Sequence, residues 1–340
     1  MLKILSEAFG VSGAEDEVRE IIKNEMLSLC DNVETDSMGN LICLKKGTKG
    51  YCNTIMLTAH MDEVGFIISG VTKEGYLRFK TVGGIDPRVL SAKKVIIGKN
   101  KTVGCIGDKP PHLEGKKKDK AASVKDLYID IGAKDDDDAL KYISIGDFAC
   151  FDSEYKEFGD ILIKGKALDD RIGCFILLDL AKNRYPHDVY FVFTVQEEIG
   201  CRGAGVATYS VKPDIAIVVE ATTCSDVPET DEAGFSTKLR GGGAISILDR
   251  SSYSAPDLRN VLYKAAVSNG IKVQYKQTTF GGNDAGAIHL TETGIKTAVI
   301  SVPCRYIHSP SCVASIGDIN SVYDILDNFL KGEVNEAWSF

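Results

Sequence analysis

Four segments of this 340-residue chain are almost continuously apolar. A strand with both faces buried has this composition, whereas a strand with one face in water alternates apolar and polar residues. Stretches with helical spacing lie between the later segments, and alternating helices and buried strands are typical of a sheet covered on both faces. We therefore predict an α/β fold with a mostly parallel sheet covered by helices. The four segments are TIMLTAH (54–60), DVYFVFTV (188–195), DIAIVVE (214–220) and KTAVISV (296–302).

A second pattern begins after Asp62. Short strand-like runs such as GFIISGV and YLRFKTVGG are broken by glycine-rich turns, which is the pattern of a small all-β module. We predict that residues 1–64 and 164–340 form one discontinuous α/β domain. The β module would be an inserted domain at residues 65–163.

Two predicted helices have recognisable starts. Ser12 and Glu15 have the spacing of a capping box, and the apolar residues that follow predict a buried helix face. The aspartates at 135–138 are interpreted as the acidic first turn of another helix, and the lysines at 116–118 as part of a solvated loop. The apolar residues of the first helix are Val18, Ile21, Ile22, Met26 and Leu29.

Charge and cysteine usage argue against several classes of protein. The formal net charge of -8 is unsuited to a phosphate-binding surface, so we predict no nucleic-acid partner. No segment reaches the roughly 18 uninterrupted apolar residues of a membrane helix, and the start MLKILSEAFG lacks the apolar stretch of a signal peptide. We therefore predict no membrane partner. The ten cysteines are scattered without a CxxC pair, as free thiols of a reducing cytoplasm are.

Side chains that bind cations close the apolar segments or stand just before a helix. In open α/β sheets, ligands bind beyond the carboxyl ends of the strands, so residues far apart in sequence can converge there. Imidazole nitrogens and carboxylate oxygens hold hard and borderline cations. The sequence therefore predicts a two-metal hydrolase. The candidates are His60, Asp62, Asp169, Asp170, Glu197, Glu198, Glu220 and His308.

Most candidates have a simpler interpretation when taken alone. A histidine two residues before a carboxylate, such as His60, is common in structural cores, and an aspartate pair can cap the helix that follows. His308, which precedes Ser-Pro, could be a turn residue. The adjacent pair Glu197 and Glu198 is harder to explain, because two carboxylates beside apolar surface cost free energy unless a cation neutralises them. Together the residues favour one metal centre.

The remaining histidines are weaker candidates. His187 precedes a strand and is expected to be exposed. His289 lies in a helix-like stretch and is expected to be a core or surface residue, and His112 lies at the edge of the polar loop. His112 could still reach an active site, but we rank all three below the other candidates.

Five motifs occur in order along the chain, namely AHMDEVG, GKALDDRIGC, TVQEEIGCRGA, EATTCSDVPE and RYIHSP. This ordered set resembles the M42 family of metallo-aminopeptidases, which groups glutamyl, leucyl and deblocking aminopeptidases and includes members with an older endoglucanase label. The resemblance covers essentially the whole chain, including DKPPH and KDLYIDIGA in the β module. It implies a zinc-peptidase-like catalytic domain and an inserted domain that mediates dimer contacts. The dimers would assemble into a hollow tetrahedral dodecamer.

The resemblance also implies two divalent metal ions per subunit. His60 would bind one ion, Asp169 would bridge both, Glu198 would ligate one, and His308 would complete the site opposite His60. Glu220 would be the remaining ligand, at a position where many relatives have aspartate. Zinc is the expected ion, with cobalt or manganese as alternatives, because imidazole and carboxylate suit all three.

The same resemblance assigns Glu197 as the general base. The implied reaction is hydrolysis of the first peptide bond of a short peptide by a water that bridges the two ions. Glu197 would take the proton of this water and then protonate the departing amine. Asp62 would orient His60 and tune its basicity, and Asp170 would hold local geometry.

Three other functions remain open on the sequence. A glycoside hydrolase would use two carboxylates as acid and base, but it needs neither the histidines nor the aspartate pair. A co-catalytic carboxypeptidase or deacylase could use the same ligands, and substrates with a free or a blocked amino terminus would distinguish it. A non-enzymatic scaffold would be free to lose Glu197 and the ligand candidates, which this chain retains.

Overall fold

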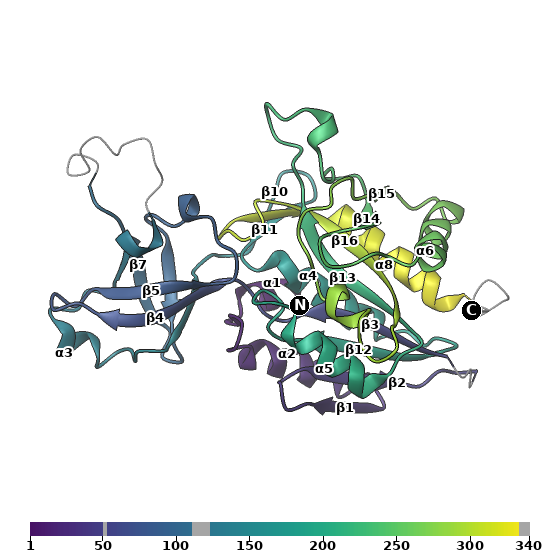
Figure 1. The fold of residues 1–340 in the computed structure, drawn as a ribbon, viewed down its shortest axis with the longest axis horizontal. Coiled ribbons are helices and arrows are strands. Elements are labelled where there is room, and N and C mark those ends of the chain that lie inside the picture. The colour runs from purple at the N-terminus through teal and green to yellow at the C-terminus, as the bar shows by residue number, and fades with distance from the viewer. Residues whose placement is uncertain (50–52, 111–122, 333–340) are drawn as a thin grey trace.

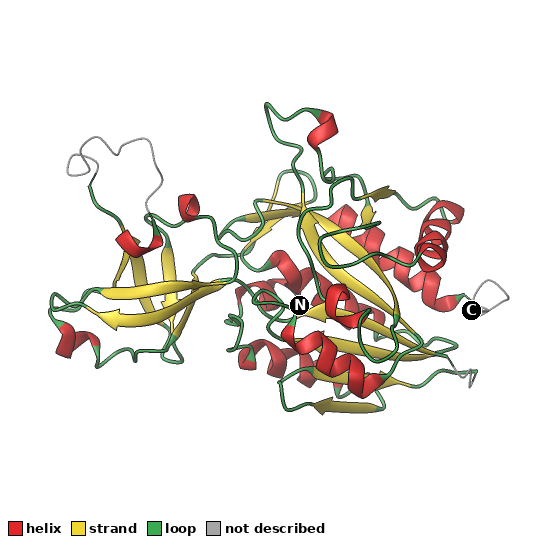
Figure 2. Ribbon diagram, in the orientation of Figure 1, coloured by secondary structure: helices red, strands yellow, loops and turns green. Residues whose placement is uncertain are grey.

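The computed structural model describes residues 1–49, 53–110 and 123–332. These residues form an α/β part built on an 11-stranded sheet and a closed β-barrel, which lies to the left in Figure 1. Helices cover the sheet, whereas the barrel is mostly strand and loop (Figure 2). The prediction of an α/β fold together with an all-β module is confirmed. Within the described ranges, no helix combines the length and the apolar character needed to span a membrane.

The centre of the large sheet is parallel. The strand order is β1 (Asn32–Thr35), β2 (Leu41–Lys45), β12 (Asp188–Thr194), β3 (Thr54–His60), β13 (Ile215–Thr223), β16 (Lys296–Arg305), β17 (Cys312–Ser315), β11 (Leu162–Gly165) and β10 (Lys156–Phe158), with β14 (Gly243–Ile245) and β15 (Val273–Tyr275) beside β16. The four apolar segments form the parallel centre β12–β3–β13–β16. The pairs toward both edges are antiparallel, so the prediction of a mostly parallel sheet is wrong there. Short connections such as that between β1 and β2 permit only antiparallel pairing.

Helices pack on both faces of this sheet. They are α1 (Leu2–Glu7), α2 (Asp16–Met26), α4 (Leu168–Leu180), α5 (Arg202–Val211), α6 (Pro256–Ser268), α7 (Ala285–Ile288) and α8 (Ile316–Lys331). In β3, Ile55 and Leu57 belong to a core shared with α4 and α8, whereas Met56 belongs to a smaller core shared with α5 and α7. Both faces of the central strands are therefore buried, which explains their continuous apolar sequence.

The β-barrel has its own core. Its strands pair in the order β4 (Gly65–Val71), β5 (Leu77–Val82), β8 (Tyr128–Asp130), β7 (Thr102–Gly107), β6 (Lys94–Ile97) and β9 (Phe148–Phe151). Phe66 packs edge-on against Phe79 and Phe151, with ring centroids 5.2 Å apart in each pair. Because β10 and β11 pair in the large sheet, residues 156–163 are not part of the barrel, contrary to their sequence assignment. Strand-like runs reveal strands but not their partners.

The helix predicted from Ser12 starts later than expected, and the shorter helix α1 precedes it. α2 begins at Asp16, and the expected capping box is wrong because both of its side chains bond elsewhere. The Ser12 hydroxyl donates to Asp62 Oδ2 at 2.6 Å, and Glu15 Oε1 accepts from the backbone N–H groups of Gly13 (2.7 Å) and Gln196 (3.2 Å). The predicted apolar face does pack against the core.

Other sequence predictions have mixed outcomes. Asp135 caps α3 (Asp136–Ala139), as its acidic first turn suggested. His187 is buried rather than exposed, with Nε2 3.0 Å from the carbonyl oxygen of Gly332 beyond α8. His289 ends α7 and is partly exposed. His112 and the lysines at 116–118 lie outside the described residues. The remaining short helical turns are Pro87–Val89, Val124–Asp126 and Glu232–Gly234.

A buried ion network joins the amino-terminal segment to the sheet. Glu63, Lys166 and Arg171 each expose 3% or less of their surface. Glu63 Oε1 accepts from Lys166 Nζ at 2.5 Å and lies 3.4 Å from Arg171 Nη2. Arg171 also donates to the carbonyl oxygens of Leu5 (2.5 Å) and Met61 (2.8 Å). The network therefore connects α1, the segment after β3 and the start of α4.

Candidate metal centre

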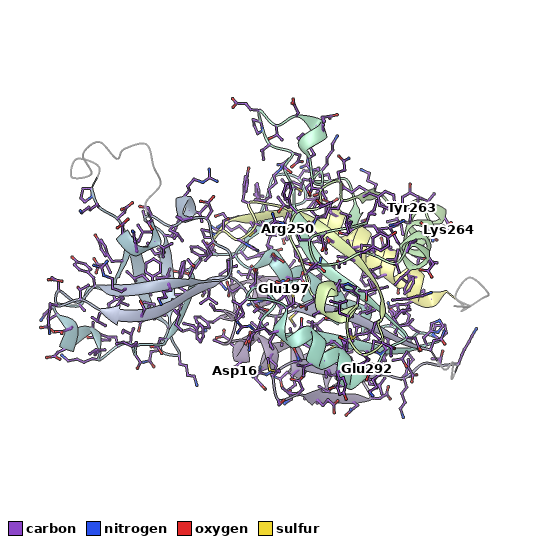
Figure 3. The ribbon with its side chains drawn as sticks, in the orientation of Figure 1. Asp16, Glu197, Arg250, Tyr263, Lys264 and Glu292 are labelled. Atoms are coloured by element: carbon purple, nitrogen blue, oxygen red, sulfur yellow. The ribbon has the colours of Figure 1, made fainter. Side chains whose placement is uncertain are left out.

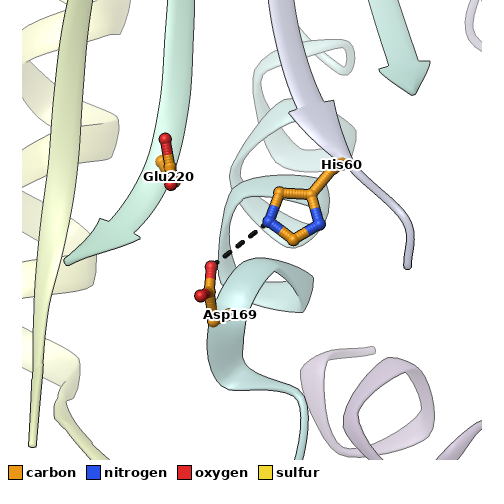
Figure 4. A group of neighbouring side chains, drawn as sticks. All are labelled: His60, Asp169 and Glu220. Atoms are coloured by element: carbon orange, nitrogen blue, oxygen red, sulfur yellow. Dashed lines mark hydrogen bonds and ion pairs between the residues drawn. The ribbon is translucent and has the colours of Figure 1, made fainter. Parts of the chain in front are cut away.

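The predicted candidates converge at the carboxyl edge of the parallel strands. His60 ends β3, Glu220 lies near the end of β13, and Glu197 follows β12 on the side that faces the barrel (Figure 3). His308 follows β16, and Asp169 lies in the first turn of α4. Figure 4 shows His60, Asp169 and Glu220 meeting from three separate elements.

Asp169 lies between the two histidines. Its Oδ1 is 3.3 Å from His60 Nε2, and its Oδ2 is 3.2 Å from His308 Nε2. Ligand atoms of His60, Asp169 and Glu220 lie within 4.8 Å of one another, and so do those of Asp169, Glu198 and His308. Asp169 is common to both groups, so the geometry suits two cations that share this carboxylate.

A backbone carbonyl orients each histidine ring. His60 Nδ1 lies 3.0 Å from the carbonyl oxygen of Asp62, and His308 Nδ1 lies 2.7 Å from that of Gly84. When Nδ1 donates to a carbonyl, Nε2 keeps its lone pair and faces Asp169, which is the arrangement of a metal-binding imidazole. Gly84 belongs to the loop after barrel strand β5. The sequence does not reveal this contact, because a backbone acceptor has no side-chain signal.

The Asp62 carboxylate holds both the His60 ring and the turn that carries Glu197 and Glu198. It lies 3.4 Å from His60 Nδ1 and accepts hydrogen bonds from the backbone N–H groups of Glu197 (3.0 Å) and Glu198 (3.1 Å). The Ser12 hydroxyl is a further donor. Burial raises the pKa of Asp62, but the hydrogen bond and charge of His60, together with the other donors, outweigh burial and lower it. Asp62 therefore stays an anion that holds the turn after β12.

The charges of this cluster fit divalent cations. Glu220 Oε2 is buried and forms no hydrogen bond within the described part of the chain. Burial, followed by the charges of Glu197 and Asp169, raises the pKa of Glu220 well above its usual range. Burial lowers the pKa of His308, but its hydrogen bonds to Asp169 and Glu198 outweigh this effect and raise the pKa to about 12. Without a cation, the crowded carboxylates raise the pKa values of Glu220 and His308. A metal ion bound by these carboxylates and imidazoles would neutralise the negative charge.

Asp170 is placed differently from its neighbour. It is fully buried, and its Oδ1 accepts a hydrogen bond from the backbone N–H of Gly173 at 3.0 Å. Burial raises the pKa of Asp170 well above its usual range. It belongs to none of the potential metal-binding groups among the described residues. This placement supports a local structural role.

Two side chains that were not among the sequence candidates, Cys201 and Asp284, lie beside Glu197. Cys201 Sγ is 3.5 Å from Glu197 Oε1, and the Thr194 hydroxyl donates to Asp284 Oδ2 at 2.5 Å. Burial raises the pKa of Asp284 to about 6. The glycine-rich segment GGNDAG before α7 was the signal that could have pointed to Asp284.

A cavity of about 310 Å³ adjoins the candidate ligands. Asp169, Glu220 and His308 contribute to its lining, as do Lys276 and Phe280. Lys276 Nζ donates to the carbonyl oxygen of Phe280 at 3.0 Å and forms no ion pair with a carboxylate among the described residues. The cavity therefore combines the candidate metal ligands with an unneutralised ammonium group.

Comparisons of sequence and of structure both relate this chain to aminopeptidases over most of its length. The family model of M42 glutamyl aminopeptidase matches residues 39–325. A candidate aminopeptidase of Acetivibrio thermocellus is 42% identical over 329 residues, which cover 96% of each chain. The TET aminopeptidase of a marine-sediment Thaumarchaeota archaeon superposes with a TM-score of 0.95 at 34% identity, covering 99% of this chain and 97% of that one. The TET1 peptidase of Pyrococcus horikoshii, which can assemble into a tetrahedron or a large octahedral shell, has a TM-score of 0.87 at 33% identity and 98% coverage of both chains.

Proposed function

This chain belongs to the M42 glutamyl aminopeptidase family, and from that premise we propose that it hydrolyses the amino-terminal peptide bond of short peptides with two divalent metal ions. The observation that carries the proposal is the position of Asp169 between His60 and His308, with Glu197 beside them. A two-metal hydrolase needs a carboxylate that both ions share, which Asp169 can supply. It also needs a base that is not occupied as a metal ligand, which Glu197 can supply.

The metal ligands divide into two groups. His60, Asp169 and Glu220 would hold one ion, and Asp169, Glu198 and His308 would hold the other. We propose zinc, with cobalt or manganese as alternatives, because imidazole and carboxylate donors suit all three. When bound, the ions supply Lewis-acid chemistry that acidifies water and polarises the peptide carbonyl.

Glu197 is the general base in this proposal. Its backbone N–H is held by the Asp62 carboxylate, which fixes the turn that carries it. Burial raises the pKa of Glu197 well above its usual range, and although His60 opposes this effect, the nearby carboxylate of Asp284 reinforces it. A carboxylate with a raised pKa accepts a proton from water and can return it to the departing amine.

Hydrolysis of a panel of aminoacyl substrates tests the proposed reaction. We expect release of the first residue, its loss after chelation, and its recovery when zinc, cobalt or manganese is added back. Release should also stop when the substrate amine is acetylated. Continued cleavage of acetylated substrates would favour a carboxypeptidase or deacylase, and no release with any of the metals would contradict a metallo-aminopeptidase.

We also propose that the 310 Å³ cavity receives the first side chain of the peptide and prefers an acidic one. Lys276 is its unneutralised cation, and the hydroxyl groups of Thr222, Ser236 and Thr278 lie in the same lining. These donors suit a carboxylate, whereas a lysyl side chain would meet a like charge.

Replacing Lys276 by Met is expected to lower kcat/KM for a glutamyl substrate by about 10- to 100-fold, because a hydrogen bond to a charged group is worth about 1.5–3 kcal/mol. Cleavage of a leucyl substrate should be little changed. Lys264→Met, an exposed position on α6 (Figure 3), is the matched control. Equal losses of kcat/KM for glutamyl and leucyl substrates would mean that Lys276 does not recognise the charge of the substrate side chain.

The barrel is proposed to form the contacts of a homodimer, and the dimers to assemble into a tetrahedral dodecamer. The similar peptidase of Pyrococcus horikoshii, which can assemble into a tetrahedron or a large octahedral shell, supports this assembly. Exposed apolar side chains on the barrel, among them Val103, Tyr142 and Ile145, offer a contact surface. A sedimentation mass equal to that of the monomer would contradict the proposal.

A further inference from the structure

Glu197, Cys201 and Asp284 form a group separate from the two that share Asp169. Ligand atoms of the three side chains lie within 4.8 Å of one another. The carbonyl oxygen of Glu197 accepts the backbone N–H of Cys201 at 2.9 Å, so a single tight turn brings both side chains together where α5 begins. Asp284 approaches from the start of α7.

Asp284 provides an independent indication of a ligand. Its side chain is 2% exposed, and one oxygen, Oδ2, accepts from the Thr194 hydroxyl. The other oxygen, Oδ1, is buried without a hydrogen bond among the residues that the structure describes, although the Cys201 thiol is close enough to the carboxylate to oppose the rise in its pKa that burial causes. A buried carboxylate oxygen without a donor is costly, and a cation would satisfy it.

We propose that Glu197, Cys201 and Asp284 bind a third divalent metal ion, of the thiophilic kind that includes zinc, and that this ion inhibits the enzyme. Thiolate selects zinc over magnesium, calcium or manganese, and the two groups that share Asp169 contain no cysteine. Binding forms a metal–sulfur bond and releases the thiol proton to solvent. Inhibition rests on the proposed function, because a Glu197 carboxylate that ligates an ion cannot accept a proton from water.

Cobalt titration detects the thiolate directly and needs no substrate. Protein loaded with two equivalents of cobalt should take up a third, and the third should produce the near-ultraviolet charge-transfer absorption of a cobalt–thiolate bond. Cys201→Ser should abolish this absorption, whereas Cys105→Ser, at an exposed cysteine of the barrel, should retain it. A third cobalt that binds without the absorption, or no third cobalt, would overturn the proposed site even if the protein is an active aminopeptidase.

Zinc inhibition then tests the consequence of binding. The wild-type protein should lose turnover as zinc rises beyond two equivalents. Cys201→Ser should shift the inhibiting zinc concentration upward by at least about tenfold, since even the loss of an outer-shell partner costs 10- to 100-fold in metal affinity. Asp284→Asn, which keeps the side-chain shape, should produce a shift in the same direction. Inhibition that is identical in wild type and both variants would overturn the assignment.

Discussion

Replacing Glu197 by Gln is expected to lower kcat by about 10²- to 10⁴-fold while two metal ions stay bound. Gln keeps the size and the hydrogen-bonding oxygen of the side chain but cannot accept and return a proton. The backbone N–H bond to Asp62 is unaffected by the substitution, so the turn after β12 should stay in place. Turnover of aminoacyl substrates and metal content per subunit are the two measurements.

The comparison of these two measurements separates the possible roles of Glu197. Ligand atoms of His60, Glu197 and Glu198 also lie close together, so Glu197 could instead hold a metal. Loss of metal together with activity would identify it as a ligand, and near-normal kcat would remove it from the mechanism. Glu292→Gln, on the surface beyond α7 (Figure 3), is the matched control and should change neither quantity.

The largest loss of stability is expected for Arg171→Met. This substitution keeps the apolar stem but removes a guanidinium group that is fully buried against Glu63 and the carbonyl oxygens of Leu5 and Met61. Removing one partner from a buried ion network leaves the others uncompensated, which typically costs about 3–5 kcal/mol. The free energy of unfolding from urea denaturation measures the effect.

Arg88→Met is the matched control for this prediction. Arg88 pairs with Asp86 on the surface, where water already solvates both charges, so its loss should not move the urea midpoint. A change for Arg171→Met no larger than that of Arg88→Met would mean that the buried network contributes no net stability.

The central strands, and the gathering of the candidate residues at one edge of the sheet, were readable from the sequence because both signals are local. A continuously apolar strand and a carboxylate at its end each occupy a few adjacent residues, and parallel strands bring such ends together. His60 and Glu220 illustrate this, since they lie at the ends of neighbouring strands β3 and β13.

Features that depend on partners distant in sequence were missed. Ser12 and Glu15 have the spacing of a capping box, but Ser12 bonds to the carboxylate of Asp62 and Glu15 to the turn after β12. His187 is a polar residue whose burial depends on the end of α8, some distance along the chain. The antiparallel pairing at the edges of the sheet also depends on partners that are distant in sequence. For example, β11 pairs with β17, which lies far along the chain.

The bond from His308 Nδ1 to the carbonyl oxygen of Gly84 joins positions 224 residues apart. A shortened protein in which a tight loop replaced the barrel would keep every proposed side-chain ligand in the α/β part, yet its His308 ring would lose the acceptor that selects its tautomer. The barrel therefore helps to orient the His308 ring, and we expect its excision to leave that ring less well oriented. The backbone path of the loop after β5, rather than its side chains, is accordingly tied to a histidine near the other end of the chain.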